Sequence, residues 1–337
     1  MINATILFPI LASFFITLLL LPVWIKRAQK AGLVGKDIQK IGKSETAEAG
    51  GVIVMVGFTV GIMLLVWINT FLLKTNQNFV EIFAMLSSLL MISYVAFTDD
   101  ILGWKIGLRR RTRLILIAFA TIPLVAINAG KSVIFLPFLG PGDLGILYPM
   151  VLVPIGIIGA TTTYNFLAGF NGLEAGQGVI ILSAMAIVTF LTGNSWLGII
   201  AFCMVAALLA FLLFNFYPAK VFPGDSLTYP VGGLIAIISI LGNFERIAIF
   251  FFSPYILETI LKTRGKLVKE SFGEPQPDGS LELKYNKIYS LTHLSIFIMK
   301  KLNIKPTERK VVLSIWTFQI LVIVAGLIIF REGVFRL

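Results

Sequence analysis

The chain has 337 residues, of which 57% are hydrophobic and only 13% are charged, and its mean hydropathy is +0.92. Ordinary globular domains are about 45–50% apolar and about 25% charged, so a soluble fold of this composition would need an implausibly large core. The single cysteine, Cys203, lies in an apolar run, which excludes a disulfide framework and a cysteine-based zinc site.

Ten apolar runs predict membrane-spanning helices. A hydrocarbon core of about 30 Å takes roughly twenty helical residues, and helices satisfy their own backbone in lipid. The first run is too long for a signal-peptide core and has no basic region before it, so we expect it to be retained. We predict one all-α polytopic membrane domain over residues 1–337. The runs cover residues 2–25, 51–73, 79–98, 113–129, 144–164, 177–192, 196–216, 227–242, 245–262 and 311–331.

Basic residues gather on one side of this predicted topology. Ten spans place five connections together, and these carry 23 of the 28 Lys and Arg residues. The positive-inside rule makes that side cytoplasmic and leaves both termini outside. The net charge of +11 is therefore one-sided. Topology alone explains much of this bias, but a basic face also attracts anionic lipid and anionic substrates, and we expect no nucleic-acid partner.

One connection, residues 263–310, is long and polar. Within it, the stretches KLVKESF and SLELKY flank GEPQPDG, and alternating residues around a Pro-Asp-Gly turn predict a small β-hairpin. The stretch YSLTHLSIFIMKKL, residues 289–302, has the apolar spacing of a helix lying along the membrane surface.

Three further polar motifs fall on the same predicted side. FTDDILGW places Asp99 and Asp100 after the third span, YNFLAGFNGLEAG carries Asn165 and Asn171 after the fifth, and YPAKVFPGDSLTYP places Asp225 after the seventh. Acids near the apolar boundary are costly unless they are paired or bind metal, which favours a functional interpretation. Four polar connections that share one face indicate a site.

Each motif also has a structural explanation. The aspartate pair could be solvated charge at a helix end, and Asp225 could belong to a simple Pro-Gly-Asp turn. The arginines of residues 109–113 could anchor a helix, and we expect His293, the only histidine, to be structural. The two asparagines are six residues apart, so on one straight helix they would face different ways, and they converge only if the helix breaks at its glycines.

Together the groups fit phosphoryl transfer. Carboxylate and amide oxygens are hard ligands suited to Mg²⁺, and Lys and Arg bind phosphate. Phosphoryl transfer depends mainly on positioning and charge neutralisation. These groups at a membrane boundary predict an enzyme that joins a soluble nucleotide-linked group to a lipid phosphate.

The motifs resemble those of the polyprenyl-phosphate N-acetylhexosamine-1-phosphate transferases, most closely the dolichyl-phosphate branch that uses UDP-N-acetylglucosamine. The matching segments span nearly the whole chain in the family's order: AEAGGV, DDILGW, NFLAGFNGLEAGQ, VFPGDS and the basic segment RGKLVK. The resemblance implies transfer of GlcNAc-1-phosphate from UDP-GlcNAc to a polyprenyl or dolichyl phosphate, with release of UMP, as the first step of lipid-linked oligosaccharide assembly for N-glycosylation.

The same resemblance implies roles for particular residues. Asn165 and Asp225 would hold Mg²⁺, with Mn²⁺ as the alternative ion. The catalytic group would be Asp99, Asp100 and Arg113. The substrate-binding group would be Glu48, Asn171, Arg264, Lys266 and Lys269. A lipid phosphate is already largely ionised near neutral pH, so neither aspartate is required as a general base.

Some alternatives stay open at this point. The bacterial peptidoglycan enzyme of the family carries a histidine cluster in its last cytoplasmic loop, whereas this chain has only His293 there, which disfavours a MurNAc-pentapeptide substrate. The acetamido sugar, the polyprenol and a homodimer are undecided. The membrane would be the cell membrane, or that of the endoplasmic reticulum in a eukaryote. A transporter or lipid flippase is the competing class, but transporters usually place ionisable groups near the bilayer midplane.

Overall fold

Long helices dominate the structure. The computed structural model describes residues 4–42, 45–136 and 140–334. Within them, seven helices are long and apolar enough to cross a membrane. They are α1 (Leu7–Lys30), α2 (Gly51–Trp67) with its π-helical continuation η2 (Ile68–Leu72), α3 (Phe79–Ile106), α7 (Leu173–Leu191), α8 (Ser195–Asn215), α9 (Asp225–Gly242) and α13 (Glu308–Ile329). A mostly helical membrane protein is therefore confirmed.

The other three predicted spans form shorter pieces. The segment 113–129 becomes α4 (Arg110–Ala120) and α5 (Ile122–Ala126), 144–164 becomes η3 (Tyr148–Leu152) and α6 (Val153–Tyr164), and 245–262 becomes α10 (Glu245–Phe251) and α11 (Ser253–Arg264). A proline stands in the first turn of α5, η3, α6 and α11. Proline lacks the N–H that would continue a preceding helix, so it favours a new start.

Short strand pairs lie at both ends of the bundle. β1 (Val34–Lys36) pairs with β2 (Glu45–Ala47), and β3 (Val133–Leu136) pairs with β4 (Gly140–Asp143), both antiparallel. In the long polar connection, β5 (Glu274–Pro275) pairs with β6 (Leu281–Glu282). A hairpin is therefore present there, but its first strand lies within GEPQPDG and none of KLVKESF forms a strand, because a turn with left-handed residues follows α11.

The amphipathic helix expected at 289–302 is α12 (Leu291–Lys301). Its N-terminus is well capped: the Ser290 hydroxyl accepts from the Thr292 N–H, and the buried carboxylate of Glu258 on α11 accepts from the Leu291 N–H at 2.7 Å. Helix termini leave such N–H groups without partners of their own, so these contacts tie α12 to α11.

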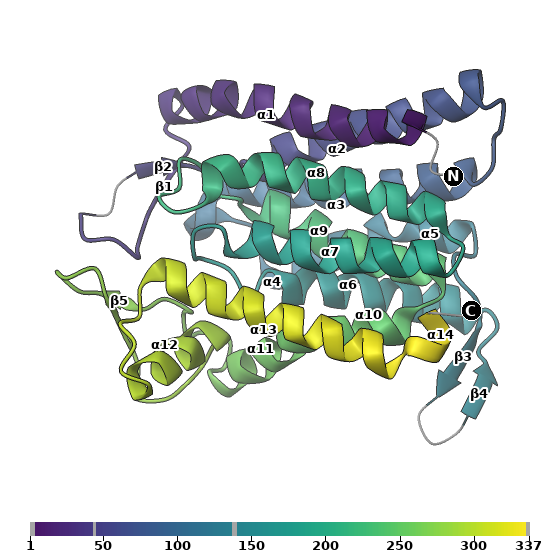
Figure 1. Cartoon of the computed structure of the whole chain (residues 1–337). Coiled ribbons are helices and arrows are strands. Elements are labelled where there is room, and N and C mark those ends of the chain that lie inside the picture. Colours follow the sequence, from purple (N-terminus) through teal and green to yellow (C-terminus); the bar gives the residue numbers. More distant parts are fainter. Residues whose placement is uncertain (1–3, 43–44, 137–139, 335–337) are drawn as a thin grey trace.

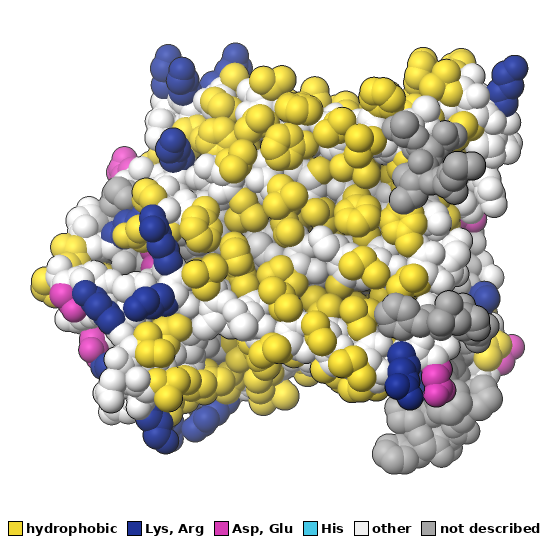
Figure 2. Space-filling model, viewed as in Figure 1, with side chains coloured by type: hydrophobic (Ala, Val, Ile, Leu, Met, Phe, Trp, Pro, Cys, Tyr) yellow, Lys and Arg dark blue, Asp and Glu magenta, His cyan; other side chains and the backbone are white. Residues whose placement is uncertain are grey.

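The helices lie side by side along one direction (Figure 1). β1, β2, β5 and α12 lie at one end, and α14 (Arg331–Val334), β3 and β4 lie at the other, where the chain also begins. Figure 2 shows a hydrophobic band over the middle of the same face, with Lys and Arg towards its ends. This distribution is that of a membrane protein, because a charge in hydrocarbon is costly. α9 lies at the centre, since nearly all of its residues are buried.

Close packing of α1 on α2 depends on two glycines. A Cβ at Gly57 would lie 2.0 Å from the Thr17 Oγ1 and 2.8 Å from the Ser13 carbonyl oxygen, and Gly61 faces a similar approach to Ser13 and Pro9. Small residues let helix backbones approach in this way. The contact therefore leaves no room for a methyl group.

We expect Gly57→Ala to lower the melting temperature in detergent, because overpacking costs about 1–3 kcal/mol. The matched control is Gly156→Ala in α6, where a Cβ would meet nothing within 4 Å. That change should leave the melting temperature unchanged or raise it, because alanine is favoured over glycine in a helix by roughly 0.5–1 kcal/mol. Equal effects of the two changes would contradict the packing.

Candidate active site

The N-terminus of α9 organises the cluster. Gly224, with φ of +69°, ends the preceding loop, and Asp225 is the first residue of the helix. Its two carboxylate oxygens accept from different elements: Oδ1 from the Asn165 Nδ2 at 2.9 Å and Oδ2 from the Arg113 Nη1 at 2.9 Å. Two of the predicted site residues therefore meet at Asp225.

Arg113 connects a third predicted site residue, Asp99, to this cluster. Its Nη1 also donates to the Asp99 Oδ2 at 2.8 Å, so one guanidinium lies between the carboxylates of α3 and α9. The other oxygen of Asp99 accepts from the Leu108 N–H at 2.5 Å, in the turn that leads into α4. All three charged side chains are largely buried, with 14–22% exposed. Partly buried carboxylates need such pairing, because an unpaired buried charge is costly.

Asp100 turns to a different partner. Its carboxylate accepts from the backbone N–H of Asp225 at 2.8 Å and from that of Ser226 at 3.0 Å. It therefore contacts the helix terminus that carries Asp225, whereas Asp99 contacts the Arg113 side chain. Adjacent residues of a helix point about 100° apart, which separates the two aspartates of FTDDILGW.

The asparagine-rich motif is a break between helices, as the sequence indicated. α6 ends at Tyr164, α7 begins at Leu173, and Gly169 and Gly172 have φ of +111° and +86°. The carboxylate of Glu174 closes the break from the first turn of α7, where its Oε1 accepts from the Gly169 N–H at 2.7 Å. The break lets Asn165 and Asn171 serve different neighbours.

Asn171 joins a second, buried cluster. Its backbone N–H donates to the Glu308 Oε1 at 2.8 Å, and its Nδ2 donates to the Asp37 Oδ2 at 3.1 Å. Asp37 also pairs with the Lys40 ammonium at 2.5 Å. The structure thus connects Asn171 to the first polar connection and to the start of α13, whereas Asn165 contacts Asp225.

Glu48 lies where two polar connections are joined. Ala47 at the end of β2 pairs with Val221 in the VFPGDS segment, and the Gly50 N–H donates to the Phe222 carbonyl at 3.0 Å. Burial raises the pKa of Glu48 above its ordinary value. Gly35 makes room for this carboxylate, because a Cβ there would lie 2.1 Å from the Glu48 Oε1.

The basic segment lies beside the start of α4. Arg264 is the last residue of α11, and Lys266 and Leu267 follow in left-handed conformation. The Arg110 Nη2 donates to the Leu267 carbonyl at 3.1 Å, which ties this segment to the helix that carries Arg113. The Lys269 ammonium lies 4.7 Å from the centre of the Tyr285 ring.

His293 lies inside the long polar connection, where its contacts fit the structural role predicted from the sequence. It is fully buried, and its two ring nitrogens lie 3.4 Å from the Tyr289 backbone N and 3.1 Å from the Phe272 carbonyl oxygen. Burial lowers the pKa of the imidazole, which favours its neutral form. The histidine therefore joins segments of the long polar connection.

Several residues that contact the predicted site residues or their segments have no role predicted from the sequence: Asp37, Glu174, Asn215, Thr228 and Glu308. Asn215 accepts from the Gly172 N–H at 3.1 Å and donates to the Val221 carbonyl at 2.8 Å, so it links two motifs. The Thr228 hydroxyl donates to the Asn165 Oδ1 at 3.0 Å. Thr228 follows Asp225 by three residues, which is helical spacing and a local signal in the sequence.

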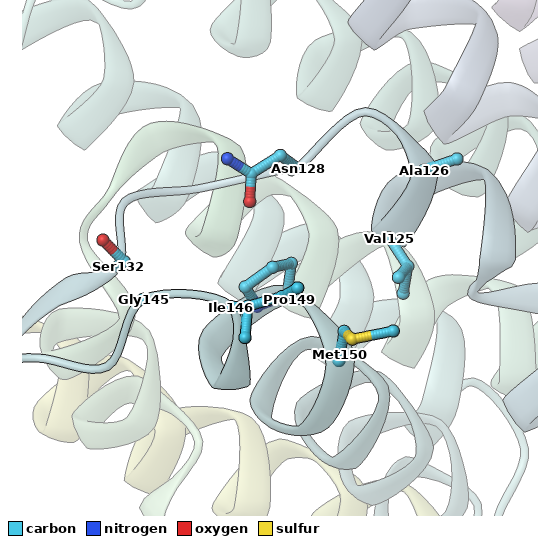
Figure 3. Close-up of a pocket in the computed structure, with 8 residues that line it drawn as sticks. All are labelled: Val125, Ala126, Asn128, Ser132, Gly145, Ile146, Pro149 and Met150. Atoms are coloured by element: carbon cyan, nitrogen blue, oxygen red, sulfur yellow. The ribbon is translucent and has the colours of Figure 1, made fainter.

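A cavity of about 550 Å³ lies at the opposite end of the bundle and is not part of this cluster. Figure 3 shows Val125, Ile146, Pro149 and Met150 lining it, with Asn128 and Ser132 at its polar side. Most of its wall is apolar, and Figure 3 shows no charged side chain among the eight lining residues. The charged groups that phosphate chemistry requires lie at the other end.

Comparisons with known proteins identify a family and relatives for this chain. The family model "Glycosyl transferase family 4" matches residues 82–243, which include Asp99, Arg113, Asn165 and Asp225. A protein of Saccharolobus solfataricus, named as a UDP-N-acetylglucosamine–dolichyl-phosphate N-acetylglucosaminephosphotransferase, is 37% identical over 96% of both chains. A Dictyostelium discoideum protein of that name is 30% identical over 72% of this chain and 67% of its own.

The similarity extends to a second enzyme name. A Clostridium botulinum phospho-N-acetylmuramoyl-pentapeptide-transferase is 31% identical over 80% of this chain and 86% of its own. These relatives share the N-acetylhexosamine-phosphate transfer in their names and differ in the sugar-bearing group. The chain therefore belongs to the polyprenyl-phosphate N-acetylhexosamine-1-phosphate transferases of glycosyl transferase family 4, as its polar motifs indicated.

Proposed function

We propose that this protein transfers GlcNAc-1-phosphate from UDP-GlcNAc to a polyprenyl phosphate of the dolichyl type. The observation that carries the proposal is the connected cluster Asp99–Arg113–Asp225–Asn165, built at one end of the bundle from three helices and the residue that follows α6. The names of the Saccharolobus and Dictyostelium relatives support this donor and acceptor. The product would be the first lipid-linked sugar for N-glycosylation.

The reaction exchanges one P–O bond for another. An oxygen of the lipid phosphate forms a bond to the phosphorus that carries GlcNAc, and the bond from that phosphorus to the bridging oxygen breaks. UMP leaves with the bridging oxygen, and the product is polyprenyl diphosphate-GlcNAc. The nucleophile needs no proton removed where the lipid phosphate is already a dianion. Catalysis then rests on positioning and charge stabilisation, which Arg113 and the basic segment can supply.

The donor set at Asp225 fits Mg²⁺. This ion commonly takes one or two protein oxygens and completes its shell with water and substrate phosphate, so it needs no larger cluster of acids. Among the residues the structure describes, no three His, Cys, Asp or Glu side chains form such a cluster. When bound, Mg²⁺ would neutralise charge on the diphosphate.

The amide of Asn165 can present its oxygen to the same ion. Its Nδ2 faces Asp225 and its Oδ1 accepts from the Thr228 hydroxyl. Because that hydroxyl both donates and accepts, the amide can turn over without losing this partner. Asn165 and Asp225 would then hold Mg²⁺, or Mn²⁺ in its place.

For topology, we propose ten crossings with the site on the cytoplasmic side. Seven crossings would leave the two ends of the chain on opposite sides, yet both lie at the same end of the bundle (Figure 1). The pairs α4–α5, η3–α6 and α10–α11 would supply the three further crossings. The excess of Lys and Arg at the other end supports a cytoplasmic location for that end, with both termini outside.

The proposed function predicts UMP release that requires both a short polyprenyl phosphate and Mg²⁺. Purified protein would be assayed with UDP-GlcNAc, UDP-GalNAc and UDP-glucose in parallel, and we expect the highest rate with UDP-GlcNAc. Release of UDP would instead indicate ordinary glycosyl transfer. Folded protein that yields no nucleotide with any donor, but moves a solute across proteoliposomes, would reveal a transporter.

The proposed ion site predicts Mn²⁺ binding that can be measured apart from turnover. With UDP-GlcNAc present, Asp225→Ala should weaken Mn²⁺ binding by at least about tenfold, because one of two protein oxygens is lost. Electron paramagnetic resonance of free Mn²⁺ measures this directly. Asn128→Ala, at the opposite end of the bundle, is the control. Unchanged binding in the Asp225 variant would place the ion elsewhere.

The Arg110–Leu267 hydrogen bond predicts a specific effect on donor binding. We expect Arg110→Ala to raise the KM for UDP-GlcNAc by about three- to tenfold, because the basic segment loses a charged hydrogen bond that holds it beside α4. Steady-state kinetics with a fixed lipid acceptor measures the change. Arg111→Ala, which removes the neighbouring exposed arginine, should have a smaller effect, and equal effects would point to net charge instead.

A further inference from the structure

We propose that Asp100 is a positioning residue that holds the N-terminus of α9 and thereby the carboxylate of Asp225. The proposal rests on the transferase function above for the role of Asp225. Asp100 would then act through Asp225 and not on the substrate, which separates it from Asp99 although the two are adjacent in the sequence.

The hydrogen bonds of α9 leave a place for such a residue. The first N–H groups of any helix have no partner within it. In α9, the N–H groups of Leu227 and Thr228 already point to the Gly224 carbonyl, at 3.2 and 3.4 Å. The two N–H groups before them, of Asp225 and Ser226, donate to one oxygen each of Asp100.

A carboxylate suits this position electrostatically. The partial positive charge at a helix N-terminus stabilises a nearby anion, and an acceptor bonded to the amides satisfies them. Because the Asp100 carboxylate comes from α3, it fixes α9 against α3 and not merely the local turn. α3 also carries Asp99, which binds Arg113, so this contact sets the distance between the two acids that share the guanidinium.

Gly224 provides independent support, because its position leaves space for Asp100. A Cβ at Gly224 would lie 2.3 Å from the Asp100 Oδ2 and 2.8 Å from its Cγ. Its φ of +69° also disfavours any other residue. The VFPGDS segment thus keeps its glycine for a steric reason that involves the aspartate of another helix.

The test compares three variants in the UMP assay. Asp100→Ala and Gly224→Ala should each lower kcat by about 100-fold, because small displacements of positioned groups cost that much. Gly224→Ala removes no functional group, so a loss there reports displacement. Asp100→Asn should lose less activity than Asp100→Ala, because its one amide oxygen can accept from one of the two N–H groups, whereas its NH2 cannot accept from the other. Gly193→Ala, with φ of +82° and open space around it, is the backbone control.

Hydrogen exchange supplies a readout that does not depend on turnover. Peptides covering the start of α9 should exchange at least about fivefold faster in Asp100→Ala and Gly224→Ala than in the unchanged protein, and Asp100→Asn should show a smaller increase. Peptides at the start of α7 should not change. Hydrogen exchange tests the anchoring of α9 whether or not the unchanged protein releases UMP. If no UMP is released, the transferase function is wrong, but the exchange rates still decide whether Asp100 holds the helix.

Three outcomes would overturn the proposal. Full activity in Gly224→Ala would show that the α9 terminus tolerates displacement. An Asp100→Asn variant as inactive as Asp100→Ala, with normal exchange at α9, would assign the charge of Asp100 to the chemistry. Unchanged exchange at α9 in Asp100→Ala would show that another group holds the helix.

Discussion

One guanidinium between two carboxylates is the interaction on which the rest of the site depends. Arg113 brings Asp99 and Asp225 within reach of the same nitrogen although they lie on different helices and are largely buried. Without that cation, two acids would face each other close to hydrocarbon, where the charged forms are costly. The ion pairs of Arg113 therefore fix the start of α4. The hydrogen bond from Arg110 to the Leu267 carbonyl then holds the basic segment after α11 beside α4. A net positive surface at this end then favours the approach of a doubly charged lipid phosphate.

The second constraint is the buried start of α9. A helix that begins inside a protein exposes amide groups that water cannot reach, and each must find an acceptor. Here the acceptors come from Gly224 within the chain and from Asp100 on α3. The same geometry directs the side chain of the first helical residue, Asp225, towards Arg113 and Asn165. Satisfying the backbone therefore also orients the acid of the site.

Much of this arrangement could be predicted from the sequence, because hydrophobic length and charge bias are local signals. The apolar runs and the gathering of Asp99, Asn165 and Asp225 at one end were predictable in this way, and Gly169 and Gly172 indicated the helix break. The different partners of Asp99 and Asp100 could not be predicted, since they depend on which helix lies beside each face of α3. Prolines stand at the starts of α5 and α11, where two of the predicted spans divide, and the hydropathy of the runs did not reveal these divisions.

Asn171 shows that residues close in sequence can have distant partners where a helix is interrupted. It shares a motif with Asn165, yet it bonds to Asp37 and Glu308, which are 134 and 137 residues away. Its donors satisfy oxygens of two buried carboxylates, and removing such a partner leaves a buried acceptor unsatisfied at a cost of about 1–3 kcal/mol. The six residues between the asparagines, with their two left-handed glycines, therefore connect two separate polar clusters. One contains Asp99 and Asp225, and the other joins the first polar connection to the last long helix, so the motif links the polar segments at this end of the bundle.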